Sequence, residues 1–128
     1  MSANFVAQAR ALLTADATVT ALVGARIYPG KLPQSPTFPA VRCTVISDAG
    51  LPSLGGNTSG KQNGRLQVDC YAKTYDGAQS VGNAVSAVLA SYSTPSLTSL
   101  QVSRRDLYED QTELFGVSID LSLWSNDT

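Results

Sequence analysis

The segment of this sequence that comes nearest to a chemical motif is Gly-Gly-Asn-Thr-Ser-Gly-Lys-Gln at residues 55–62. Its spacing nearly matches the phosphate-binding pattern G-x-x-x-x-G-K-[ST], in which a hydroxyl after the lysine binds magnesium. Gln62 stands where that hydroxyl should be. The residues that follow are patterned as a strand, so no helix N-terminus would face a phosphate. We therefore interpret the segment as a Gly/Ser loop and expect no nucleotide site.

Two other residue sets could do chemistry, and neither has the partners that it needs. Four carboxylates gather between residues 106 and 113, as in a glycosidase pair, but no aromatic cleft is evident beside them. The chain contains no histidine, so every His-dependent triad, metal cluster and proton shuttle is excluded. Cys43 and Cys70 are too few for a cysteine-rich zinc site. We expect no catalytic, cofactor-binding or metal-binding residue.

Composition narrows the class of protein further. The 128 residues match one domain, 1–128, of ordinary size. Nine basic and ten acidic side chains give a net charge of −1, whereas a nucleic-acid-binding domain usually has a clear basic excess. The sequence has neither the pattern of a signal peptide nor the roughly 18 apolar residues of a membrane span. We expect a soluble, intracellular, non-enzymatic domain whose weak self-repulsion is compatible with assembly into a larger object.

Hydrophobic periodicity predicts three helical segments. Apolar residues recur at helical spacing over residues 5–13, and Asp16 is a good N-cap for a second, short helix that Gly24 ends. Prolines then punctuate residues 27–39, which predicts an extended connector. A third helix is expected from Asp76 to about Tyr92, because its apolar residues recur with a period near 3.6.

Alternation of apolar and polar residues predicts four strands. The seventeen residues from Asp48 to Gly64 hold five glycines and little to bury, so we expect a long flexible loop there. A bulge near Arg104–Asp106 would bring the two halves of the third strand into phase. The order α-α-β-β-α-β-β favours an α+β fold: a mostly antiparallel sheet of four or more strands, one parallel pairing beside the third helix, and helices on one face. The predicted strands are 40–47, 65–72, 100–110 and 113–124.

The predicted strands place the two cysteines on apolar faces, where they could be close neighbours. We favour two buried thiols that act as small hydrophobes over a disulfide. Gln67, Asp69 and Tyr71 alternate with the apolar residues and would lie on a half-solvated face. In a ring, that face could line a channel or meet a neighbouring subunit.

Residues with exposed or interactive side chains outside the predicted core are candidates for contact with partners. Arg104 and Arg105 would lie on opposite faces of a strand and could meet phosphate or a partner's carboxylates. Trp124 could cover the open sheet face or anchor a subunit interface. The glycine-rich loop could become ordered on meeting a partner. The candidates are Leu54, Asn57, Lys61, Arg104, Arg105, Glu109 and Trp124.

Three stretches resemble the tail-completion, or tail-terminator, proteins of long-tailed bacteriophages. The first, residues 11–34, contains Val-Gly-x-Arg-Ile-Tyr-Pro at 23–29 after a helical start. The second, residues 38–47, begins a strand at Pro39. The third, residues 65–89, has the strand, the Tyr-Ala pair and the helix with spaced alanines and valines that the family shares. The likeness covers nearly the whole chain.

The resemblance implies a ring, usually of six copies, on the end of the tail tube. Such a ring stops tube polymerisation and offers a docking surface for the head–tail connector, while DNA passes through without specific binding. It also implies a virion protein at the tail end next to the head, present in the host cytoplasm during assembly and away from membranes. Alternatives are a head-completion or minor tail protein of related fold, a cytosolic interaction module outside phage, and, least favoured for want of histidine, a small hydrolase.

Overall fold

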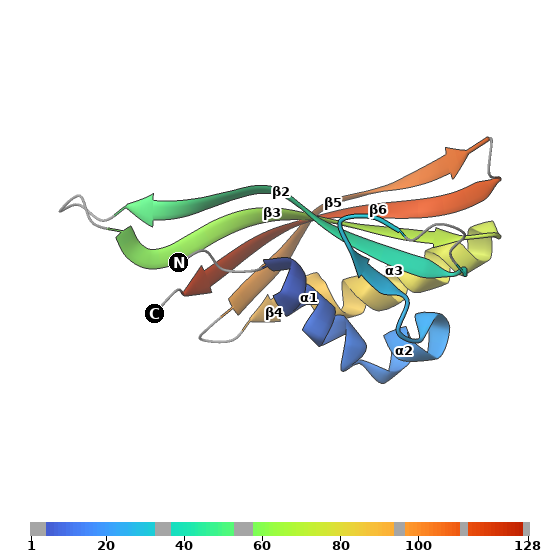
Figure 1. Cartoon of the computed structure of the whole chain (residues 1–128), viewed down its shortest axis with the longest axis horizontal. Helices are drawn as coiled ribbons and strands as arrows, with labels where there is room; N and C mark the ends of the chain where they lie inside the picture. The colour runs from blue at the N-terminus through green and yellow to red at the C-terminus, as the bar shows by residue number, and fades with distance from the viewer. Residues whose placement is uncertain (1–4, 33–36, 53–57, 94–96, 111–112, 127–128) are drawn as a thin grey trace.

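The computed structural model describes residues 5–32, 37–52, 58–93, 97–110 and 113–126. In these ranges three helices cover one face of a single long, curved sheet, and the other face carries no helix (Figure 1). The helices are α1 (Phe5–Thr14), α2 (Ala17–Val23) and α3 (Tyr75–Leu89). The strands are β1 (Ile27–Pro29), β2 (Ala40–Pro52), β3 (Thr58–Ala72), β4 (Ser91–Ser93), β5 (Leu97–Glu109) and β6 (Leu114–Asn126).

The sheet has six strands in the order β1-β2-β3-β6-β5-β4. It is mixed, because β1 pairs parallel with β2 while the other neighbours pair antiparallel. The α+β class and the helices on one face are confirmed. The prediction of a mostly antiparallel sheet of four or more strands is corrected to a mixed sheet of six, and the element order is corrected as well. β1 and β4 are three-residue strands, too short for alternation to reveal. The parallel pairing also lies at β1 rather than beside α3.

The predicted loop over 48–64 is wrong for residues 48–52 and 58–64, which belong to a long β2–β3 hairpin. The two strands pair from Ala40↔Tyr71 to Pro52↔Thr58. A strand ladder is built from backbone N–H and C=O groups, which glycine supplies as well as any residue, so a lack of apolar side chains does not prevent pairing. Residues 53–57 lie outside the described residues.

The last two strands are confirmed, and their bulge lies elsewhere than predicted. In β5 the register shifts between Gln101 and Ser103, before the predicted position at 104–106. Val102 is the extra residue, and its side chain is half exposed. This shift brings the two halves of β5 into phase, as a bulge does.

Side chains at the helix ends account for where α2 and α3 begin. The Asp16 carboxylate accepts hydrogen bonds from the backbone N–H groups of Thr18 (2.9 Å) and Val19 (3.0 Å). Gly24 ends α2 at a φ of 59°, in a region that glycine adopts without strain. Thr74, rather than the predicted Asp76, caps α3, and its Oγ1 accepts from the N–H of Gly77 at 3.0 Å.

The core lies between the helices and the two central strands. Leu66, Val68 and Cys70 of β3 lie level with Leu121, Ile119 and Val117 of β6, and all six are fully buried. Helix α3 packs closely on these strands at Gly82, where a Cβ atom would stand 3.0 Å from Val117 Cγ1. A larger residue at position 82 would therefore force Val117 or Arg104 to shift by a few tenths of an ångström.

Both cysteines are free and buried, as predicted. They occupy neighbouring rungs, since Val41 pairs with Cys70 and Cys43 pairs with Val68. Burial raises the pKa of the Cys43 thiol to about 12 and also raises that of Cys70. Both groups are therefore neutral thiols at physiological pH.

We predict that Ile119→Ala lowers the free energy of unfolding by about 2–5 kcal/mol, because it leaves a cavity in the middle of the core. Denaturant unfolding followed by circular dichroism measures the loss. The control is Leu100→Ala, which truncates a side chain that is 50% exposed and should change stability by less than about 0.5 kcal/mol. An unchanged midpoint for Ile119→Ala would contradict the assigned sheet face.

The thiols generate a prediction for alkaline pH. Above the ordinary thiol pKa of 9.0, the unfolded chain releases protons that the folded chain keeps, so stability falls as pH rises. Each buried thiol contributes up to about 1.4 kcal/mol per pH unit in that range. The variant Cys43→Ala/Cys70→Ala should lose less stability between pH 8 and 10.5 than the wild type. Equal losses would show that the thiols ionise as readily in the folded state.

Candidate functional site

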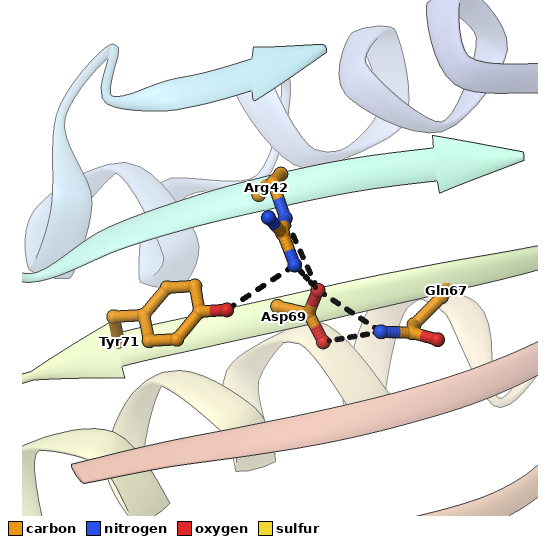
Figure 2. Close-up of polar contacts among 4 residues, drawn as sticks. All are labelled: Arg42, Gln67, Asp69 and Tyr71. Carbon is orange, nitrogen blue, oxygen red and sulfur yellow. Dashed lines mark hydrogen bonds and ion pairs between the residues drawn. The ribbon is translucent and has the colours of Figure 1, made fainter. Parts of the chain in front are cut away.

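The open face of the sheet carries a polar cluster that is partly sealed from solvent. Arg42 of β2 reaches across to Asp69 of β3, and Gln67 and Tyr71 lie on either side (Figure 2). Asp69 has no exposed surface, although none of the described helices covers this face. The side chains of the neighbouring strands therefore shield the carboxylate.

Sheet geometry places these four side chains together. Arg42 and Asp69 are direct cross-strand partners, so their side chains rise from the same point on the same face. Gln67 and Tyr71 precede and follow Asp69 by two residues, and alternation turns them to that face as well. The cluster thus follows from the β2–β3 register.

Hydrogen bonds satisfy both oxygens of the buried carboxylate. Arg42 Nη2 lies 2.6 Å and Nε 3.2 Å from Asp69 Oδ2. Gln67 Nε2 donates to Oδ1 at 2.9 Å and to Oδ2 at 3.1 Å. Arg42 Nη2 also donates to the Tyr71 hydroxyl at 3.3 Å, with the guanidinium 5.8 Å from the ring centroid. A charge-assisted bond of this kind is strong and fixes the geometry of both groups.

The electrostatics of this cluster favour a fixed structure over reactivity. The hydrogen bond to Asp69 raises the pKa of Arg42, against the opposing effect of burial. Burial raises the pKa of the Tyr71 hydroxyl, which therefore stays protonated at neutral pH. A neutral phenol and a guanidinium already paired with a carboxylate offer neither a nucleophile nor a general base. The cluster holds two strands in register and presents a neutralised surface.

A second, more exposed charge pair lies farther along the same face. Arg105 Nη1 is 3.9 Å from Asp120 Oδ2, and Ser103 Oγ donates to that oxygen at 3.0 Å. Asp120 pairs across the ladder with Gln67, so the two charge pairs are neighbours on the open face. Asp69 and Asp120 thus each have an arginine partner.

Arg104 points to the helix side and joins a polar chain with α3. Its Nη2 donates to Gln79 Oε1 at 2.9 Å, and Gln79 Nε2 donates to Asp106 Oδ1 at 2.8 Å. The hydroxyl of Tyr75 donates to Asp106 Oδ2 at 3.1 Å, which raises the pKa of Tyr75. Phe115 stacks edge-on against Tyr75 at 6.1 Å between ring centroids.

The predicted contact residues that the structure describes do not gather into one site. The two arginines lie on opposite faces, as expected, and Arg104 is occupied within the chain. Trp124 is 41% exposed on the open face, and Glu109 is exposed at the end of β5. The backbone of Lys61 pairs with Asn126 in β6. Leu54 and Asn57 lie outside the described residues.

Sequence reasoning missed the ion pair of Arg42 with Asp69. The available signal was one basic and one acidic residue at polar positions of two successive strands. Alternation predicts their face, but only the register shows that they are opposite each other. Among the described residues there is no group of three potential metal ligands and no helix long and apolar enough to cross a membrane.

The family model of tail completion protein gp17 matches residues 7–126 of the chain. The chain belongs to this family. Membership indicates a structural role in a bacteriophage tail and makes the protein a virion component. A solved chain of the virion of a native gene transfer agent particle has the same fold, with a TM-score of 0.69 at 15% identity, over 94% of this chain and 92% of that one. No curated protein matches.

We predict that Arg42→Ala costs about 1–3 kcal/mol, because it leaves the Asp69 carboxylate buried without its cation. The estimate stays below that for a fully buried pair because the Arg42 side chain is 32% exposed. Arg105→Ala is the matched control, since its longer and more exposed pair should contribute under about 1 kcal/mol. Chemical denaturation of both variants measures the difference, and equal losses would show that burial of Asp69 does not matter.

Proposed function

We propose that this tail completion protein terminates the phage tail tube and joins the tail to the head. Family membership over residues 7–126 carries the proposal. It acts by binding and without catalysis: a ring of copies, six by resemblance to the family, covers the last tube ring and removes the surface on which another would stack. The opposite side of the ring then receives the head–tail connector protein.

The charge pattern of the open sheet face supports a role beside passing DNA. Phosphate attraction grows with each unpaired basic side chain, so a channel that must release DNA benefits from neutralised cations. On this face two of the three described arginines, Arg42 and Arg105, lie against Asp69 and Asp120, while Arg65 is exposed and has no carboxylate partner among the described residues. The proposed ring would let DNA pass without holding it specifically.

The test is deletion of the gene from the phage followed by electron microscopy of the particles. We expect overlong tails that lack heads, and complementation by the wild-type gene should restore both length and joining. The Leu100→Ala gene should complement as well, since that change leaves the fold intact. Tails of normal length beside unjoined heads would favour a head-completion role, and intact infectious particles would exclude a structural role at this junction.

A further inference from the structure

Most of β2 has no partner strand on its outer side within the described residues. The three residues of β1 pair with Val41, Arg42 and Cys43, and the last bond on that side runs from the Gly30 N–H to the Cys43 carbonyl at 2.8 Å. From residue 44 to Pro52, no strand in the described part of the chain pairs with this edge. We call residues 44–52 the β2 edge.

The opposite margin of the sheet has the same design. The three residues of β4 pair with Thr98, Ser99 and Leu100, and the Gln101 N–H donates to the Ala90 carbonyl at 3.0 Å. Beyond that point the described ranges contain no strand that pairs with residues 102–109 on the outer side. We call residues 102–109 the β5 edge.

The two edges are complementary in length and direction. Strands β2, β3, β6 and β5 are successive antiparallel neighbours, so β5 runs opposite to β2. A second copy placed beside the first in the same orientation presents its β2 edge antiparallel to the β5 edge of the first. Open edges of this kind offer rows of unpaired N–H and C=O groups and are templates for another strand.

We propose that the β5 edge of one copy pairs with the β2 edge of the next copy, head to tail, so that one continuous sheet runs around the assembly. The contact joins two different surfaces of the same chain, and a heterologous contact of this type closes into a ring when its rotation allows. The inference rests on the proposed function and assigns the contact that builds its ring.

The short strands fix how the two copies align. β1 blocks the first part of β2 and β4 blocks the first part of β5, so the open halves meet only if the second copy is displaced along the strand direction. Thr44 shares a rung with Ser103 through Gln67 and Asp120. Full overlap brings residue 44 beside Glu109, so the displacement is six residues at about 3.4 Å each, or roughly 20 Å. Such a stagger tilts the strands against the ring axis, as in closed barrels.

Exposed apolar side chains lie on both edges. Ile46, at the bulge of β2, is 56% exposed, and Tyr108, near the end of β5, is 53% exposed. Full antiparallel overlap brings the start of the β2 edge beside the end of the β5 edge, which places Ile46 near Tyr108. Val102, at the bulge of β5, is 50% exposed at the other end of the contact.

The test uses two edge variants, Ile46→Lys on β2 and Val102→Lys on β5. Both side chains are exposed in the single copy, so folding should survive, and lysine is a residue that natural edges use to block pairing. Leu100→Lys is the matched control, because Leu100 is equally exposed on β5 but lies in the half that β4 covers. Thermal melting of each variant verifies the fold.

Sedimentation measures the assembly state of each variant alone and of the two edge variants mixed in equal amounts. We expect each edge variant to assemble at least about tenfold more weakly than the wild type, and the mixture to stop at a one-to-one dimer with one intact contact. Rings formed by either edge variant at wild-type concentration would overturn the proposal. Homodimers of Ile46→Lys alone would also overturn it, because they would show β5 pairing with itself.

Hydrogen exchange of the wild type separates this inference from the proposed function. The outward-facing backbone amides among residues 44–51 and 102–109 should become protected together when the ring forms. A ring in which these amides exchange as fast as in the single copy would leave the proposed function standing and refute the edge pairing. A chain that stays monomeric even with the tube protein would contradict both.

Discussion

The antiparallel register of β3 against β6 is the constraint on which the rest of the molecule depends. It brings Leu66, Val68 and Cys70 level with Leu121, Ile119 and Val117, and the helices cover this face. Because side chains alternate, the same register decides everything on the other face. A slip of one residue would expose the core and bury the charges.

The charged cluster shows how that constraint extends to the surface. Asp69 follows Val68 by one residue and so faces away from the helices, into a position where Arg42 stands opposite. A buried carboxylate is costly without a cation, which makes any other β2–β3 register unfavourable. The ion pair thus selects one register of β2 against β3 and also stabilises the folded sheet. This is a structural use of charge, in keeping with a protein of the phage tail.

The sequence was informative where patterns are long and repeated. Alternation over 65–72 and 113–124 located the central strands, and the period of 3.6 located α3. Prediction from the sequence failed where a strand depends on pairing with a distant segment. β1 and β4 form because a neighbouring strand pairs with them, and their own three residues carry no recognisable pattern. Residues 48–52 and 58–64 failed for the same reason, because their glycines hid a ladder made by the backbone alone. Half of the candidate site could be predicted from the sequence: alternation gives the face on which Asp69 lies, but it does not give Arg42 as its partner.

The burial of both cysteines makes the protein suited to site-specific labelling. Since Cys43 and Cys70 lie beneath the helices with their ionisation suppressed, maleimide dyes and spin labels will find no rapidly reacting sulfur on the folded chain. A single cysteine introduced on the surface would then be a unique attachment point without removal of either native one. Fluorescence or distance measurements within an assembling tail would therefore report on the introduced label alone.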